Sequence, residues 1–308
     1  MAHGLTHGDL AAECDGLHLR ALARMSLGDT AGFDSDRDRL ERLSAEVPDW
    51  HRHAFLRLWR GARAMMEGRF DDTETELGGL LDLGIRSHDP NVQNLALGQL
   101  IFLRRAQGRL GELAAVVEQQ CRRQPLVTAF ACGATLMHAE SGEPDQAARS
   151  LGCFVDGGSV RVPRDLTWTT SLCFLTEAAI AVSDARFART LLDALSPYRG
   201  QVAVLSKGMA VTGAFDRYIG GLQALLGDEG ARASFEAALE LESSLNAPAL
   251  VARTMVRFGG WLICQTGRKD QSLGESLLGE ARGLASAFRM RGLLSEISAQ
   301  PPVVGTVS

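Results

Sequence analysis

The sequence predicts an all-α fold, a right-handed α-solenoid of about seven helical hairpins. The first indication is a short turn motif that recurs along the chain, with its glycine or serine at positions 28, 68, 108, 142, 183, 227 and 267. The spacings of 40, 40, 34, 41, 44 and 40 residues are typical of stacked helix–turn–helix repeats. The second indication is that no two alternating β-branched runs are joined by a hairpin turn, so strands are not expected.

The segment from Arg217 to Leu245 shows the hairpin pattern most clearly. From Ala231 onward, apolar residues recur at the i, i+4, i+7 and i+8 spacing of one helical face. A shorter apolar stripe precedes Gly227, where the tight turn begins. A single hairpin cannot bury such a face alone and needs neighbouring copies. The stripe around Phe235 is therefore expected to form core between repeat units.

The remaining elements follow in chain order, with one apolar helical run on each side of every turn. Between the fourth and fifth turns, the glycine-rich Asp156–Gly158 is expected to be a loop. Pro163 and Asp165 are expected to start the next helix, with Asp165 as a good N-cap. Residues 1–295 are predicted to form one domain, and residues 296–308, which contain proline and glycine, a flexible tail.

Composition excludes several classes of function. The net charge of −5 gives no overall positive field for a nucleic-acid backbone, so no direct nucleic-acid partner is expected. No apolar run reaches the roughly 18 residues of a membrane span, and the N-terminal residues lack a signal-peptide pattern. The cytoplasm is the expected location. Six scattered cysteines without a C-x-x-C pair indicate reduced thiols, most of them buried, and no disulfide framework.

Two sets of residues resemble a known family. Gly61, Ala64, Gly68, Phe70 and Leu77 are similar to the tetratricopeptide pattern, as is the segment around Phe235. Ordered blocks over about residues 10–290 resemble more closely the tetratricopeptide-like region of bacterial ATPase-type transcriptional regulators of the LuxR, SARP and cyclase-linked kinds. The resemblance implies a helical array and a role in bacterial regulation.

The activities of those relatives cannot be carried over to this chain. The phosphate-binding G-x-x-x-x-G-K-[ST] loop is absent, and no helix-turn-helix follows the helical array. The ATPase and DNA-binding modules of the regulators are therefore not expected here.

No catalytic or metal-binding motif was found. His51 and His53 are two residues apart, which places them on different helix faces, and His3 and His7 lie at a terminus expected to fray. Neither a nucleophile elbow nor a zinc-protease motif occurs. No catalytic residue, no metal ligand and no cofactor are therefore predicted.

The resemblance implies a concave groove lined by the first helix of each repeat. Counting back from each turn gives a mostly apolar inner surface with few polar side chains, as in ligand sites. A superhelix that fills its own groove, or a register error of one residue (roughly 100°), would place these residues elsewhere. The predicted binding residues are Phe55, Leu58, Met65, Phe102, Arg105, Leu136, Glu177, Arg217, Arg257 and Trp261.

These residues lead to three hypotheses of function. The first is a non-catalytic module that binds a protein or peptide partner in its groove, with Arg105, Arg217 and Arg257 holding an anionic group such as a carboxylate. The second is a receptor for an apolar small molecule. The third is an unusual enzyme of secondary metabolism, with Glu177 or His138 as the acid or base. A protein partner requires an open groove, whereas a receptor or enzyme requires a closed cavity.

Overall fold

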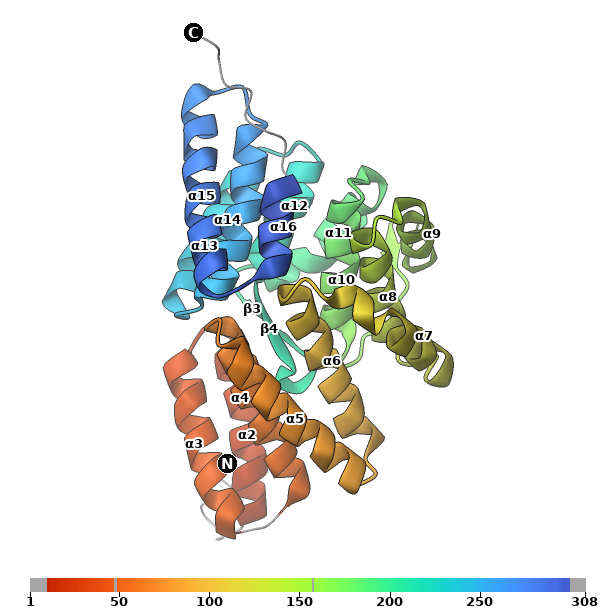
Figure 1. The fold of residues 1–308 in the computed structure, drawn as a ribbon, viewed down its shortest axis with the longest axis vertical. Helices are drawn as coiled ribbons and strands as arrows, with labels where there is room; N and C mark the ends of the chain where they lie inside the picture. The colour runs from red at the N-terminus through yellow and green to blue at the C-terminus, as the bar shows by residue number, and fades with distance from the viewer. Residues whose placement is uncertain (1–9, 47–48, 157, 300–308) are drawn as a thin grey trace.

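The computed structural model describes residues 10–46, 49–156 and 158–299, which form fifteen α-helices and two short β-hairpins (Figure 1). Most helices pack in sequential pairs, as the recurring turns predicted. The helices are α2 (Leu10–Ser26), α3 (Thr30–Glu46), α4 (Trp50–Met66), α5 (Phe70–Arg86), α6 (Pro90–Ala106), α7 (Ala114–Arg123), α8 (Thr128–Glu140), α9 (Pro144–Phe154), α10 (Trp168–Ala181), α11 (Ala185–Leu195), α12 (Phe215–Leu225), α13 (Ala231–Ser244), α14 (Pro248–Ile263), α15 (Arg268–Ala287) and α16 (Arg291–Ala299).

The recurring turn residues end the first helix of each pair. The first six all adopt a left-handed backbone conformation, with φ from 54° at Ser183 to 81° at Gly28. A residue in this conformation is the usual end of an α-helix, which explains why glycine recurs there. The seventh residue, Gly267, differs, because its φ is −81° and it lies at the start of α15.

The prediction of an array without strands is wrong, most importantly for residues 202–214, which form a buried β-hairpin. Strands β3 (Val202–Leu205) and β4 (Ala210–Ala214) form an antiparallel hairpin. Nearly every residue of both strands is buried, so the sequence carries no alternation of apolar and polar residues. The turn between the strands holds three consecutive left-handed residues, Ser206, Lys207 and Gly208.

A second correction concerns the segment before α10. Two short strands, β1 (Val155–Asp156) and β2 (Ser159–Val160), pair on either side of the predicted loop at Asp156–Gly158, of which Asp156 belongs to β1 and residue 157 lies outside the described residues. Helix α10 begins at Trp168, later than predicted. The Asp165 carboxylate still acts near the helix start, because it accepts a hydrogen bond from the Thr167 backbone N–H at 2.7 Å.

The β3–β4 hairpin lies at the centre of the molecule (Figure 1). It contacts α2, α4 and α6 on one side and α12, α13 and α14 on the other. The two sides also touch directly, since Arg63 of α4 donates a hydrogen bond to the Leu245 carbonyl at 3.1 Å, and α16 packs on α6. The inner space of the helical array is therefore filled by the chain's own hairpin.

The hydrophobic core follows this closed arrangement. One cluster of buried side chains extends from Cys14 to Ile297, and a smaller one around Phe235 lies between α13, α14 and α15. All six cysteines are free thiols, and three of them are buried. Residues 296–299, assigned above to the tail, belong to α16, and residues 300–308 lie outside the described part. Among the described helices, none combines the length and apolar character needed to cross a bilayer.

Candidate functional site

Four of the predicted binding residues meet at one buried carboxylate. Glu177 of α10 accepts hydrogen bonds from Arg105 of α6 at 2.9 Å and from Arg257 of α14 at 3.0 Å, both through Oε2. Arg217 of α12 lies 3.9 Å from its other oxygen. These residues come from four helices that are far apart in the chain, and the structure brings them together as one ion-pair cluster.

Glu177 is held in its ionised form. Burial alone would raise the pKa of Glu177, but the charges of Arg105, Arg257 and Arg217 outweigh this effect and hold the pKa well below its usual range. A carboxylate of this kind is a poor proton donor or acceptor near neutral pH. His138, the other candidate acid or base, instead pairs with Glu143 at 2.6 Å at the α8–α9 turn.

Arg217 is the most buried of the three arginines, with 4% of its surface exposed. Its Nη2 donates to the Thr212 carbonyl and to the Tyr218 hydroxyl. Its Nη1 has no hydrogen-bond partner among the described residues, and the nearest carboxylate oxygen, on Glu242, is 3.6 Å away. One nitrogen of the Arg217 guanidinium, Nη1, is therefore left without a hydrogen-bond acceptor.

Arg253 belongs to the same cluster and was missed in the sequence. It lies on α14 one turn before Arg257, a spacing that places both side chains on one helix face. Within the described residues, Arg253 forms no ion pair within 4 Å. Burial, together with the like charges of Arg105 and Arg217, lowers the pKa of Arg253 to about 10. Arg253 is thus a partly buried cation without a direct counter-charge.

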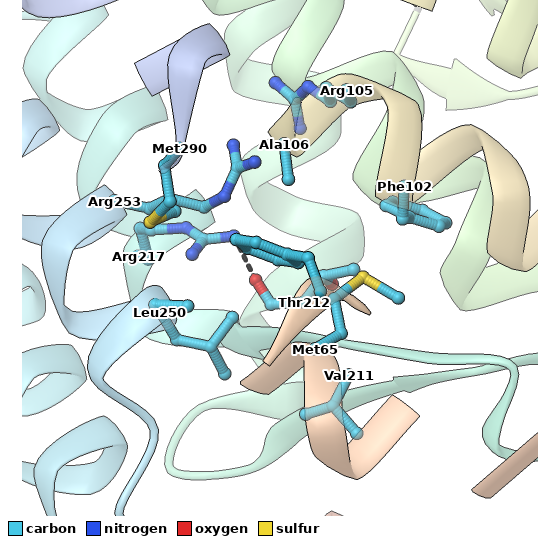
Figure 2. A pocket seen from close by; sticks show the side chains of 12 residues that line it. Met65, Phe102, Arg105, Ala106, Val211, Thr212, Arg217, Leu250, Arg253 and Met290 are labelled. Carbon is cyan, nitrogen blue, oxygen red and sulfur yellow. Dashed lines mark hydrogen bonds between the residues drawn. The ribbon is translucent and has the colours of Figure 1, made fainter. Parts of the chain in front are cut away.

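These arginines line a small cavity, called here the arginine cavity, of about 30 Å³ (Figure 2). Figure 2 shows the side chains of Arg105, Arg217 and Arg253 converging on it from three different elements. The rest of the wall is mainly apolar. The cavity is lined by Met65, Phe70, Phe102, Arg105, Ala106, Val211, Thr212, Arg217, Ala249, Leu250, Arg253 and Met290.

A larger cavity of about 310 Å³, called here the apolar cavity, lies between α6, α8, α10 and the β3–β4 turn. It was not predicted, because its walls include the hairpin that the sequence did not reveal. The lining residues are Asn91, Asn94, Leu95, Gly98, Ile101, Val127, Ala129, Phe130, Leu166, Thr167, Thr170, Phe174, Ser206, Lys207 and Met209.

Two aromatic rings link the two cavities. Phe102 of α6 lines the arginine cavity, and Phe174 of α10 lines the apolar cavity. The rings stack with their centroids 5.3 Å apart and their planes within 7° of parallel. Helix α6 therefore contributes to both cavities, and α10 contributes to the apolar cavity alone.

The other predicted residues lie in different surroundings. Met65 lines the arginine cavity together with Phe102. Leu58 and Leu136 are fully buried core residues and line neither cavity. Phe55 packs edge-on against His18 with centroids 4.5 Å apart, and Trp261 packs against Phe258 and Phe235 in the smaller core cluster. The predicted apolar groove surface is thus divided among the core, the arginine cavity and two aromatic clusters.

Comparisons with protein-family models, with curated proteins and with solved structures found no match. The function therefore has to be inferred from the chemistry of the two cavities. Within residues 10–46, 49–156 and 158–299, no group of three or more His, Cys, Asp or Glu side chains is placed to hold a metal ion. His3 and His7 lie outside the described residues.

Proposed function

We propose that the protein is a non-catalytic receptor for a small apolar molecule, which binds in the apolar cavity. One observation carries this proposal: the β3–β4 hairpin packs among the central helices, and a cavity of about 310 Å³ remains beside the hairpin's turn. Ligand sites are commonly concavities of about 300–1,000 Å³ with mostly apolar walls and few polar groups. A concavity of this volume matches a small molecule better than an extended peptide.

The walls of the apolar cavity indicate the class of ligand. Ile101, Phe130, Phe174 and Met209 contribute apolar surface. The hydroxyl groups of Thr170 and Ser206 are hydrogen-bonded to each other at 3.1 Å, and Asn94 is already engaged by Gln120 and Gln124. Few polar groups are left for the ligand, so we expect an apolar ring or chain with at most one or two hydrogen-bonding atoms.

The β3–β4 turn offers a route from ligand to regulation. Its Lys207 carbonyl accepts a hydrogen bond from Trp59 of α4 at 2.9 Å, and the Met209 carbonyl accepts one from Gln99 of α6 at 2.9 Å. Left-handed residues other than glycine are strained, and two of them, Ser206 and Lys207, form this turn. A ligand that presses on Ser206 or Met209 would thus change how the hairpin packs on α4 and α6.

The wider context of the proposal is bacterial regulation by a tetratricopeptide-like solenoid that has closed on its own hairpin. The regular turn spacing and the left-handed turn residues support this origin. A protein or peptide partner is the second candidate, supported by Leu126 and Leu166, which are 89% and 69% exposed. Leu166 and the neighbour of Leu126, Val127, line the apolar cavity, so an apolar side chain of a partner could enter there.

Thermal unfolding in the presence of apolar metabolites and of amphipathic helical peptides tests the proposal. A ligand at about a hundredfold excess over its Kd should raise Tm by about 5 °C, because it stabilises only the folded chain. Ala129→Phe fills the apolar cavity and should abolish the shift, whereas Ala115→Phe, at an exposed site on α7, should preserve it. Stabilisation by peptides alone, or an unchanged metabolite shift in Ala129→Phe, would contradict the receptor proposal.

A further inference from the structure

We propose that the arginine cavity is a second, separate binding site, and that it takes a short aliphatic monocarboxylate. The carboxylate would bind between Arg217 and Arg253, and the alkyl chain would lie against Met65, Leu250 and Met290. This site does not share a lining residue with the apolar cavity. Four observations, on hydrogen bonding, charge, wall chemistry and access, lead to this assignment.

The first observation is that the guanidinium groups of Arg217 and Arg253 are incompletely paired. Arg217 Nη1 is buried and has no hydrogen-bond acceptor among the described residues, and Arg253 forms no ion pair there within 4 Å. Leaving a buried charged donor such as Arg217 Nη1 unsatisfied is unfavourable. Arginine donors match the two oxygens of a carboxylate, which could bridge one arginine on α12 and one on α14.

The second observation is the balance of charge. Arg105, Arg217, Arg253 and Arg257 supply four positive charges, and the carboxylates of Glu140, Glu177 and Glu296 lie within ion-pair distance of this group. The fourth carboxylate, Glu242, is fully buried, and burial raises its pKa to about 7. Below pH 7, where Glu242 is mainly protonated, the cluster carries one excess positive charge, which a monoanion would neutralise and a dianion would exceed.

The third observation is the chemistry of the remaining wall. Met65, Phe102, Val211, Leu250 and Met290 surround the arginine side chains with apolar surface. The volume of about 30 Å³ is close to that of one water molecule, so a carboxylate fits only when the flexible side chain of Met65 or Met290 moves aside. An inorganic anion would leave this apolar surface without a complement, whereas the methyl or ethyl group of acetate or propionate would cover it.

The fourth observation concerns access. Phe70, at the start of α5, lines the arginine cavity and also a cleft of about 560 Å³ on the neighbouring surface. Four arginines lie along that cleft, with two aspartates, Asp71 and Asp72, beside them. The cleft therefore offers an anion a positively charged approach that leads to Phe70, the residue that lines both spaces. The arginines are Arg69, Arg109, Arg289 and Arg291.

Isothermal titration with sodium propionate, sodium chloride and sodium phosphate at pH 7 and constant ionic strength tests the site. We expect propionate to bind with one-to-one stoichiometry, and chloride and phosphate to bind at least tenfold more weakly. Arg253→Met should weaken propionate binding about ten- to hundredfold, the equivalent of one lost charge-assisted hydrogen bond. Arg282→Met, an exposed site on α15, should leave it unchanged.

Two further variants keep the test decisive. Arg253→Lys keeps the charge but loses the planar pair of donors, so it should fold like the wild type and still bind propionate more weakly. Ala129→Phe, which blocks the apolar cavity, should leave propionate binding intact. Equal binding of chloride and propionate, or wild-type affinity in both Arg253 variants, would overturn the assignment. Neither result would bear on the receptor proposal, which concerns the other cavity.

Discussion

Arg105 of α6 and Glu177 of α10 form a buried ion pair, with Arg105 Nη2 2.9 Å from Glu177 Oε2 and about a tenth of each side chain exposed. Helix α6 belongs to the third predicted repeat unit and α10 to the fifth. The pair therefore ties together parts of the chain that a simple linear stack would keep apart. Arg257, from the seventh unit, joins the same oxygen and closes the arrangement.

Removing the negative charge of Glu177 should strongly destabilise the fold. Glu177→Gln leaves Arg105, Arg217 and Arg257 without their shared counter-charge, and breaking a buried ion pair in this way costs about 3–5 kcal/mol. Urea denaturation at pH 7 measures the loss. Glu140→Gln is the matched control, because Glu140 pairs with Arg105 but is exposed, and its loss should cost about 1 kcal/mol or less. Equal effects of the two substitutions would show that the Glu177 cluster does not hold the helices together.

The stability that Glu177 contributes should also depend on pH. The pKa of its carboxyl is held well below the ordinary value of 4.5 once the chain is folded. The contribution is therefore complete above about pH 4.5 and is lost as the pH falls toward the lowered folded-state pKa. Denaturation curves of wild type and Glu177→Gln should converge at acid pH. Curves that remain equally separated at pH 3 and pH 7 would argue against an electrostatic origin.

Much of this cluster could be predicted from the sequence, because the recurring turns fix which residues of each helix face inward. Counting back from each turn placed Arg105, Glu177, Arg217 and Arg257 on one inner surface, and the structure brings all four together. Arg253 was missed because the count took too few positions from its helix. Its i, i+4 spacing from Arg257 was the available signal.

The sequence could not reveal what fills the centre. The β3–β4 hairpin is buried on both faces, so its strands lack the period of two by which a half-buried strand is recognised. Small apolar residues such as Ala203 and Ala210 also suit a helix. The same hairpin packs against α4, which carries the core residue Leu58. It also explains why the apolar cavity was not predicted, since part of its wall comes from the hairpin's turn.

Gly213, at the end of β4, should not tolerate a side chain. Its φ of 116° is unfavourable for other residues, and an added Cβ would collide with Glu242 Oε1 and lie 2.6 Å from Arg217 Nη1. Gly142 provides the matched control, because its φ is 77° but an added Cβ there would meet nothing within 4 Å. Gly142→Ala should cost about 1–2 kcal/mol for backbone strain, and Gly213→Ala clearly more. If urea denaturation shows similar losses of stability in the two variants, the side chains of Glu242 and Arg217 can move aside at little cost.

Glu242 should make the protein less stable as the pH rises toward the alkaline range. Its carboxyl accepts hydrogen bonds from the Ala214 N–H at 2.9 Å and the Thr254 hydroxyl at 2.6 Å, with Arg217 3.6 Å away. Burial outweighs these contacts and raises the pKa from the ordinary 4.5 to about 7. The folded chain therefore binds a proton that the unfolded chain has already lost, and this stabilisation disappears as the pH rises from 4.5 through 7.

The size of the effect should be on the order of 3 kcal/mol between pH 5 and pH 8. Glu242→Gln keeps the shape without the charge, and its amide can accept from the Ala214 N–H and donate to the Thr254 hydroxyl. Its stability should therefore stay nearly level over this range and exceed that of the wild type at pH 8. Urea denaturation at half-unit pH intervals provides the comparison. Glu236→Gln, at an exposed site on α13, should follow the wild-type curve. Parallel curves for wild type and Glu242→Gln from pH 5 to pH 8 would place the titrating group elsewhere. Charge in the cluster around Arg217 would then have to be balanced without a proton on Glu242.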